Sequence, residues 1–148
     1  YDIGLGIPAE PLFRSSYIYT ISCNWVVRWM ARFEAEFYER ENGEQPAREF
    51  LLSLDKKMRA KMLMIIGVLQ DNGYELREPY SKHLSEGIFE LRAQVGSDIS
   101  RVLYFFYVDQ RIVLTNGFIK KTQKTPPQEI EKAKRYRADY LSRRRETK

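Results

Sequence analysis

Cationic side chains gather in the second half of this chain, in and just after strand-like segments. Arg92 and Arg101 stand in two neighbouring hydrophobic segments, FELR and SRVLYFF. Lys120, Lys121 and Lys124 follow the next such segment, within the run KKTQKT. A guanidinium group binds phosphate through two parallel hydrogen bonds, and an ammonium group adds a compact charge. Cations that converge in this way could grip a polyanion, exchange a proton and stabilise a phosphoryl transition state.

Two further residue types near the arginines could serve the same chemistry. His83, beside Lys82, suits a general acid or base near neutral pH, and Tyr104 could stack on an unpaired base. Each has a structural alternative, since a single histidine is commonly a hydrogen-bonding residue and Tyr104 stands in an apolar run. The arginines have one as well, because Glu90 and Arg92 are two apart on one strand and suit cross-strand ion pairs.

Residue counts argue against several classes of site. Cys23 is the single cysteine and His83 the single histidine. A disulfide framework, a cysteine-rich zinc site and a two-histidine metal site are therefore not expected within one chain. The sequence also lacks the nucleophile-elbow, zincin and Rossmann signatures, so we predict no metal and no cofactor. With no apolar run of about 20 residues we expect no membrane contact, and the single cysteine favours a reducing, cytoplasmic location.

Charge is unevenly distributed along the chain, whose formal net charge is +5. Residues 120–148 hold 11 Lys and Arg against 4 Asp and Glu, whereas residues 1–119 hold 14 against 16. A basic end on a near-neutral body favours contact with a phosphate backbone or with an acidic protein. The alternative is a solvated helix whose charges serve solubility.

Hydrophobic periodicity predicts an α+β domain in the order β-α-α-β-β-β-α, with a small antiparallel sheet packed by helices. Asp55 is placed to cap the second helix, and Asn72-Gly73 to end it. Short links between the last three strands favour an antiparallel meander. The expected strands are 31–39, 88–95, 99–108 and 111–119, and the expected helices are 46–54, 56–72 and 128–141.

Side chains alternate along a strand, so the sequence also predicts which residues share a face of the sheet. On the last strand Asn116, Phe118 and Lys120 point to the same side. One face could thus present Arg92, Arg101 and Lys120 beside aromatic rings.

Residues 30–148 are expected to form a single domain, because this part of the chain shows no repeat, linker or second patterned region. Residues 1–29 show no clear period, and we expect them to be upstream sequence read in frame before a biological start at Met30. The alternative is an N-terminal arm whose Trp25 and Trp29 pack on the domain.

Four stretches of the chain resemble HigB-type toxins in the phage-derived branch of the RelE/ParE superfamily. They are FYERENGEQPAREFL, SKHLSEGIFELR, SRVLYFF and NGFIKKTQKTPPQEIEKAKRYRADYL. The resemblance implies a RelE-like fold and the toxin of a type II toxin–antitoxin system, a metal-independent endoribonuclease that cleaves mRNA on the ribosome and inhibits translation. It also implies a HigA-like helix-turn-helix antitoxin as partner. A non-catalytic toxin of the same fold, or a basic nucleic-acid-binding module, is the alternative.

The same resemblance assigns roles to residues of this chain. Arg92 and Arg101 match positions of phosphate-binding arginines, and Lys120 and Lys121 match a basic motif after the last strand. Lys82 and His83 match the charged approach to the strand that carries FELR. The candidate catalytic residues are therefore Arg92, Arg101, Lys120, Lys121 and His83, and the candidate RNA-binding residues are Lys82, Lys124 and Tyr104. For the superfamily's C-terminal tyrosine, Tyr136 and Tyr140 are loose matches.

Overall fold

The structure, a computed structural model, describes residues 33–119 and 124–146. The expected start at Met30 and the segment 1–29 lie outside these residues, and so do Lys120 and Lys121.

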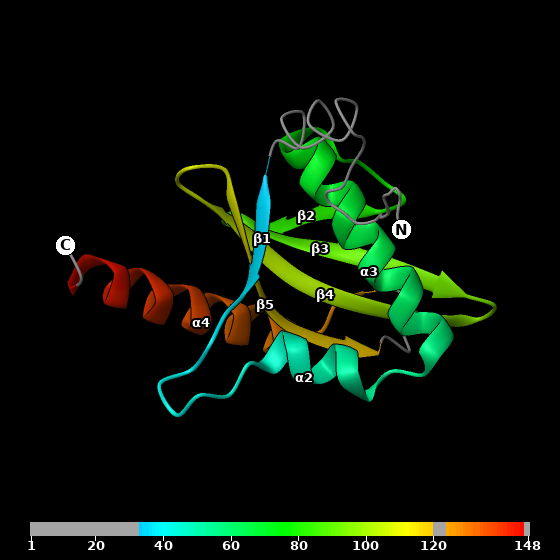
Figure 1. Ribbon diagram of the computed structural model, residues 1–148, viewed down its shortest axis with the longest axis horizontal. Helices are drawn as coiled ribbons and strands as arrows, with labels where there is room; N and C mark the ends of the chain where they lie inside the picture. Colours follow the sequence, from blue (N-terminus) through cyan, green and yellow to red (C-terminus); the bar gives the residue numbers. More distant parts are fainter. Residues whose placement is uncertain (1–32, 120–123, 147–148) are drawn as a thin grey trace, which may run out of the picture.

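Within these residues, five strands form one sheet in the order β1-β5-β4-β3-β2 (Figure 1). The strands are β1 (Glu34–Phe37), β2 (Ser81–Ser85), β3 (Ile88–Val95), β4 (Asp98–Tyr107) and β5 (Arg111–Ile119). The helices are α2 (Pro46–Ser53), α3 (Lys56–Asn72), the short 3-10 helix η1 (Gly73–Glu75) and α4 (Pro127–Glu146). The α+β class and the small RelE-like arrangement predicted from the sequence are confirmed.

Two features of the sheet go beyond the predicted meander. Residues 79–84, expected from the sequence only as a short extended piece, contribute most of the edge strand β2, which pairs antiparallel with β3. The first strand does not continue the antiparallel pattern, because β1 pairs parallel with β5. Neither feature has a local signal, since β2 is short and polar and the partner of β1 lies far along the chain.

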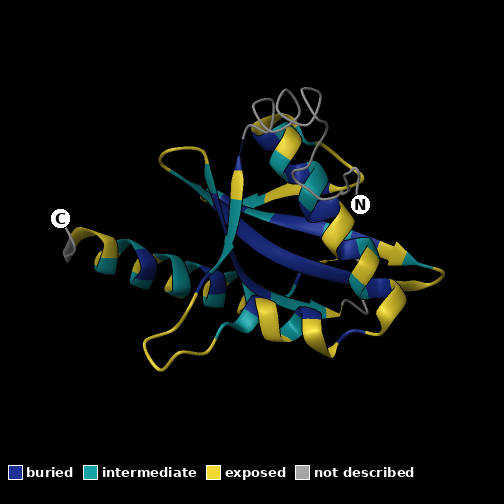
Figure 2. Ribbon diagram, in the orientation of Figure 1, coloured by how far each residue is buried: buried dark blue, intermediate teal, exposed yellow. Residues whose placement is uncertain are grey.

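The sheet carries a separate hydrophobic core on each face. On one face α2 and α3 pack against Leu91, Val102, Tyr104 and Leu114. On the other face α4 packs through Ala133 against a second cluster, made by Ile88, Leu103, Phe105 and Val113. Figure 2 shows the central strands as the most deeply buried part of the molecule.

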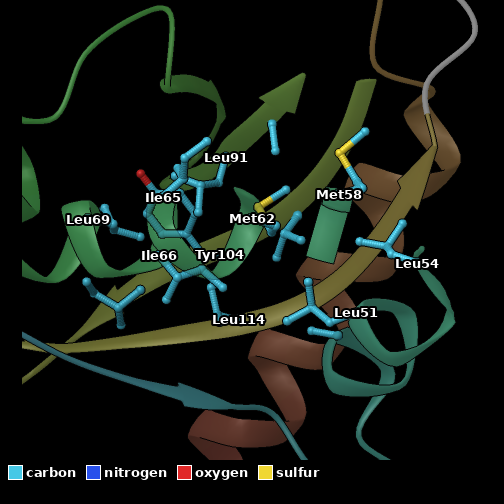
Figure 3. Packing of buried hydrophobic residues seen from close by; sticks show 14 of the residues in the cluster. Leu51, Leu54, Met58, Met62, Ile65, Ile66, Leu69, Leu91, Tyr104 and Leu114 are labelled. Atoms are coloured by element: carbon cyan, nitrogen blue, oxygen red, sulfur yellow. The ribbon is translucent and has the colours of Figure 1, made fainter. Parts of the chain in front are cut away.

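The sequence of α3 explains both its ends and its buried face. The Asp55 carboxylate accepts a hydrogen bond from the Met58 amide at 2.9 Å, as an N-cap residue should. Gly73 ends the helix at a φ of 54°, and a Cβ there would lie 1.9 Å from the Phe33 ring. The buried side chains recur at helical spacing and fill the first core (Figure 3): Met58, Met62, Ile65, Ile66 and Leu69.

An irregularity in β5 decides which of its side chains face α4. Leu103 of β4 pairs with Asn116, whereas its neighbour Tyr104 pairs with Leu114, so Thr115 is an extra residue in β5. Beyond this bulge, Asn116 and Phe118 share the face that α4 covers, as the alternation predicted. Gly117 turns towards α2, where its missing side chain leaves room for Phe50.

Candidate functional site

Arg92 and Arg101 lie directly opposite each other on β3 and β4. Directly opposed residues of an antiparallel pair point to the same side, and here both point to the face covered by α4. Like charges in such a pair destabilise a sheet unless something neutralises them. The sequence therefore brings its two candidate phosphate-binding arginines together, but in an arrangement that needs a counter-ion.

Glu90 is that counter-ion, and none of its surface is exposed. Its Oε2 atom accepts a hydrogen bond from Arg92 Nε at 2.9 Å and another from Arg101 Nη1. Its Oε1 atom accepts one from the Thr125 hydroxyl, just before α4 begins. We call Glu90, Arg92, Arg101 and Thr125 the Glu90 cluster.

Electrostatics keeps the Glu90 carboxylate ionised. Burial by itself raises the pKa of Glu90, but the hydrogen bonds from Thr125 and Arg92 and the positive charge of Arg101 outweigh it, so the pKa lies below its usual value. Burial lowers the pKa of Arg101, and the nearby Glu90 opposes this shift.

The two arginines differ in how far solvent reaches them. The Arg101 side chain is 6% exposed, and its Nε atom has no hydrogen-bond partner within the part of the chain that the structure describes. The Arg92 side chain is 24% exposed, and its Nη1 atom lies 3.7 Å from the exposed Glu78 carboxylate. An anion arriving from solvent would therefore meet Arg92 first.

Two candidate lysines, Lys82 and Lys124, stand near the Glu90 cluster in different ways. Lys82 pairs with Glu90 across β2 and β3, so its exposed side chain starts from the same face. Lys124 is exposed and directly precedes Thr125. The end of β5 also lies near the cluster, because Ile119 pairs with Ser100, the neighbour of Arg101. The described part of the chain resumes at Lys124.

His83 and Tyr104 lie on the opposite face of the sheet from the arginines. His83 pairs with Phe89, its ring centroid lies 5.0 Å from the Phe89 ring, and its Nε2 atom accepts a hydrogen bond from the Gly87 amide at 3.2 Å. Tyr104 is 1% exposed, and Figure 3 shows it among the side chains of the first core. Both positions fit the structural alternatives that the sequence left open.

The Tyr104 hydroxyl lies 2.5 Å from the Ser81 hydroxyl. Burial raises the pKa of Tyr104 to about 12, and the hydrogen bond with Ser81 only partly offsets this shift. The ring is therefore a neutral core side chain and does not offer a stacking surface for RNA bases.

Tyr136 lies in the middle of α4 and Tyr140 in its second half. At 1.5 Å per residue, Tyr140 is about 20 Å along the chain from Thr125. Its hydroxyl donates to Glu36 of β1, and the Tyr136 ring stacks on Tyr38 with centroids 4.7 Å apart. These tyrosines hold α4 against the first strand and take no part in the Glu90 cluster.

Sequence reasoning allowed an ion pair of Glu90 and offered Thr125 as a hydroxyl donor, but it did not identify Glu90 as the centre of the site or predict its contact with Thr125. Glu90 had a usable signal, since a carboxylate two residues before an arginine shares its face of a strand. Thr125 had none, because its approach to Glu90 depends on the path of the chain after β5.

Within residues 33–119 and 124–146, no group of three or more His, Cys, Asp or Glu side chains could hold a metal ion. Among the described helices, none combines the length and the apolar character that crossing a bilayer requires.

The chain matches the model of a known protein family over more than half of its length. The family model described as phage derived protein Gp49-like (DUF891) matches residues 49–138, which include every member of the Glu90 cluster. None of the curated proteins compared with the chain matches it.

Proposed function

Because this chain belongs to the Gp49-like family of phage-derived proteins, a toxin-like family of the RelE/HigB-type group, we propose that it is the toxin of a type II toxin–antitoxin system. We further propose that it is a HigB-type endoribonuclease that cleaves mRNA on the ribosome in the cytoplasm and so inhibits translation. Its partner is a HigA-like helix-turn-helix antitoxin, which holds it silent.

One observation carries the enzymatic part of this proposal. Arg92 is held by a fully buried carboxylate through its Nε atom, while its side chain remains 24% exposed to solvent. A cation fixed in advance of binding stabilises developing negative charge better than a mobile one, because no reorganisation is needed during the reaction.

The chemistry is a transesterification at one phosphodiester. A base takes the proton of the 2′-hydroxyl, and the 2′ oxygen forms a bond to phosphorus. The bond from phosphorus to the 5′ oxygen then breaks, and an acid gives that oxygen a proton, which leaves a 2′,3′-cyclic phosphate and a 5′-hydroxyl. Arg92 would stabilise the charge on the non-bridging oxygens.

The proton-transfer groups are proposed from the sequence. Lys120 and Lys121 remain the candidates, because both neighbouring parts of the chain approach the Glu90 cluster. Ile119 pairs with Ser100, the neighbour of Arg101, and Lys124 directly precedes Thr125. His83 is not placed for this task, because its side chain starts from the opposite face of the sheet.

The test is induced expression followed by mapping of RNA 5′ ends, with and without the neighbouring gene. We expect cuts within translated frames and growth arrest that the neighbouring gene relieves. Arg92→Ala should reduce cutting by at least about tenfold, as loss of a charge-assisted phosphate contact would. Arg48→Ala is the matched control, because Arg48 is exposed on α2, on the other face of the sheet.

Two outcomes would contradict the proposal. Intact RNA with blocked DNA replication would indicate a non-catalytic toxin of the same fold. Intact RNA without growth arrest, when the expressed protein is folded, would indicate a basic nucleic-acid-binding module.

A further inference from the structure

We propose that Glu90 is a positioning residue, which aims Arg92 at the substrate phosphate and uses Arg101 as its buried support. The inference rests on the proposed function, since it concerns the same phosphate site. It changes the role of Arg101 from a substrate contact, as the sequence predicted, to a residue that acts through Glu90.

The orientation of Arg92 is the first step in the argument. Its Nε atom donates to Glu90 Oε2 at 2.9 Å, which uses the inner edge of the guanidinium group. The two Nη groups form the outer edge, which has the geometry for a bidentate contact with phosphate, and the side chain is 24% exposed. Nη1 on this edge lies 3.7 Å from an exposed carboxylate, that of Glu78, so an anion already reaches it from the solvent side.

The burial of Arg101 is the second step. Its side chain is 6% exposed, and its Nη1 atom donates to the same Glu90 oxygen that Arg92 uses. A substrate phosphate could bind Arg101 only by displacing a buried carboxylate with three donors. Arg101 therefore supplies the charge that makes a buried Glu90 tolerable beside Arg92.

Two carboxylates of opposite character flank Arg92, and they provide a matched comparison. Glu90 is fully buried, whereas the Glu78 side chain is 65% exposed. Replacing either residue by glutamine removes one negative charge from the surroundings of Arg92. If charge alone mattered, both changes would strengthen anion binding. If Glu90 positions Arg92, the two changes have opposite effects.

The experiment titrates the full-length protein with inorganic phosphate and follows the Arg92 Nε–H resonance by NMR, assigned with Arg92→Lys. We expect Glu78→Gln to strengthen phosphate binding by about twofold, because a competing anion is removed. We expect Glu90→Gln to weaken it by at least about fivefold, because the fixed guanidinium is lost. Stronger binding in both variants would overturn the proposal.

Two further variants separate positioning from folding. Glu90→Gln/Arg101→Gln removes both buried charges together, and we expect it to fold as the wild type does while phosphate affinity stays reduced. Recovery of wild-type affinity in this double variant would show that Glu90 acts through the fold alone. Arg101→Lys keeps the charge, and a loss of affinity of about tenfold or more would make Arg101 a substrate contact instead.

The phosphate titration needs neither RNA cleavage nor a ribosome. If RNA mapping finds no cuts, the ribonuclease function fails while the response of Arg92 to phosphate can still be measured. If cuts occur but Glu78→Gln and Glu90→Gln behave alike, the positioning role fails by itself.

Discussion

At the scale of single residues, side-chain alternation on β3 and β4 separates polar chemistry from packing. Glu90 and Arg92 face α4, whereas Phe89 and Leu91 between and beside them face the core formed with α3. Between Phe89 and Arg92, polar and apolar residues therefore alternate between the two faces of the sheet. The effect of a substitution should depend on the face as much as on the residue type.

Lys82 and His83 test this dependence, because they are neighbours on β2 that start from opposite faces. We expect Lys82→Ala to weaken RNA binding by about two- to tenfold and to reduce its salt dependence, as loss of one phosphate contact would. His83→Ala should leave growth arrest and RNA cleavage within about twofold of wild type. Filter binding at several salt concentrations and cleavage assays measure both effects. A folded His83→Ala variant without activity would contradict the assignment of faces.

Tyr104 is expected to matter for stability and not for activity. Tyr104→Phe removes the hydrogen bond with Ser81 and leaves a buried hydroxyl without its partner. We expect the free energy of unfolding to fall by about 1 kcal/mol in urea titrations. The variant should still cause growth arrest. If a stably folded Tyr104→Phe protein no longer arrested growth, Tyr104 would have a role in RNA binding after all.

The sequence could predict Arg92 and its face, because charge and alternation are local properties. It could not predict the difference in exposure between Arg92 and Arg101. Nor could it predict that Thr125, 35 positions after Glu90 in the chain, donates a hydrogen bond to this buried carboxylate. Residues that act through long-range contacts leave no local signal.

At the scale of elements, the contact of α2 with β5 depends on a missing side chain. A Cβ atom at Gly117 would lie 2.2 Å from Phe50 Cδ2, far inside contact distance. The bulge at Thr115 is what turns Gly117 towards α2 and sends its neighbours Asn116 and Phe118 towards α4. The sequence predicted β5 and the shared side of Asn116 and Phe118, but neither the bulge nor the parallel pairing with β1.

Gly117 and Gly67 form a matched pair for testing this contact. Gly117→Ala should lower the free energy of unfolding by about 1 to 3 kcal/mol, because Phe50 must move. Gly67 lies within α3 with open space around it, so Gly67→Ala should raise stability by about 0.5 to 1 kcal/mol through helix propensity. Urea titrations of both variants give the comparison, and equal effects of the two substitutions would contradict the packing described.

At the scale of the whole molecule, buried tyrosines lie between the sheet and the helices on both of its faces. Tyr38 donates to Asp139 at 2.5 Å, Tyr140 donates to Glu36, and Tyr104 lies in the core under α3. Burial is the main cause that raises the pKa of each hydroxyl from 10.0 to about 12, and the neighbouring carboxylates add to it for Tyr38 and Tyr140.

This arrangement predicts unfolding in alkali. The folded state holds these three protons more tightly than the unfolded chain, so stability is fully present below pH 10 and falls as the pH rises towards about 12. We expect part of the tyrosinate absorbance to appear together with loss of circular dichroism in this range. Tyr38→Phe should reduce the tyrosinate absorbance that appears together with unfolding. Tyrosinate absorbance that rises gradually, without loss of circular dichroism, would contradict the prediction.

The parallel pairing of β1 with β5 has a consequence for how the protein is made. Arg111, which pairs with Glu36 by charge, follows it by 75 positions, and synthesis of that stretch takes about 4 to 15 s. Until then β1 has no strand beside it, and Glu90 acquires its Thr125 hydrogen bond later still. The nascent chain therefore contains Arg92 and Arg101 before the Glu90 cluster can form. The cluster is complete only after Thr125 has been synthesised, late in the synthesis of the domain.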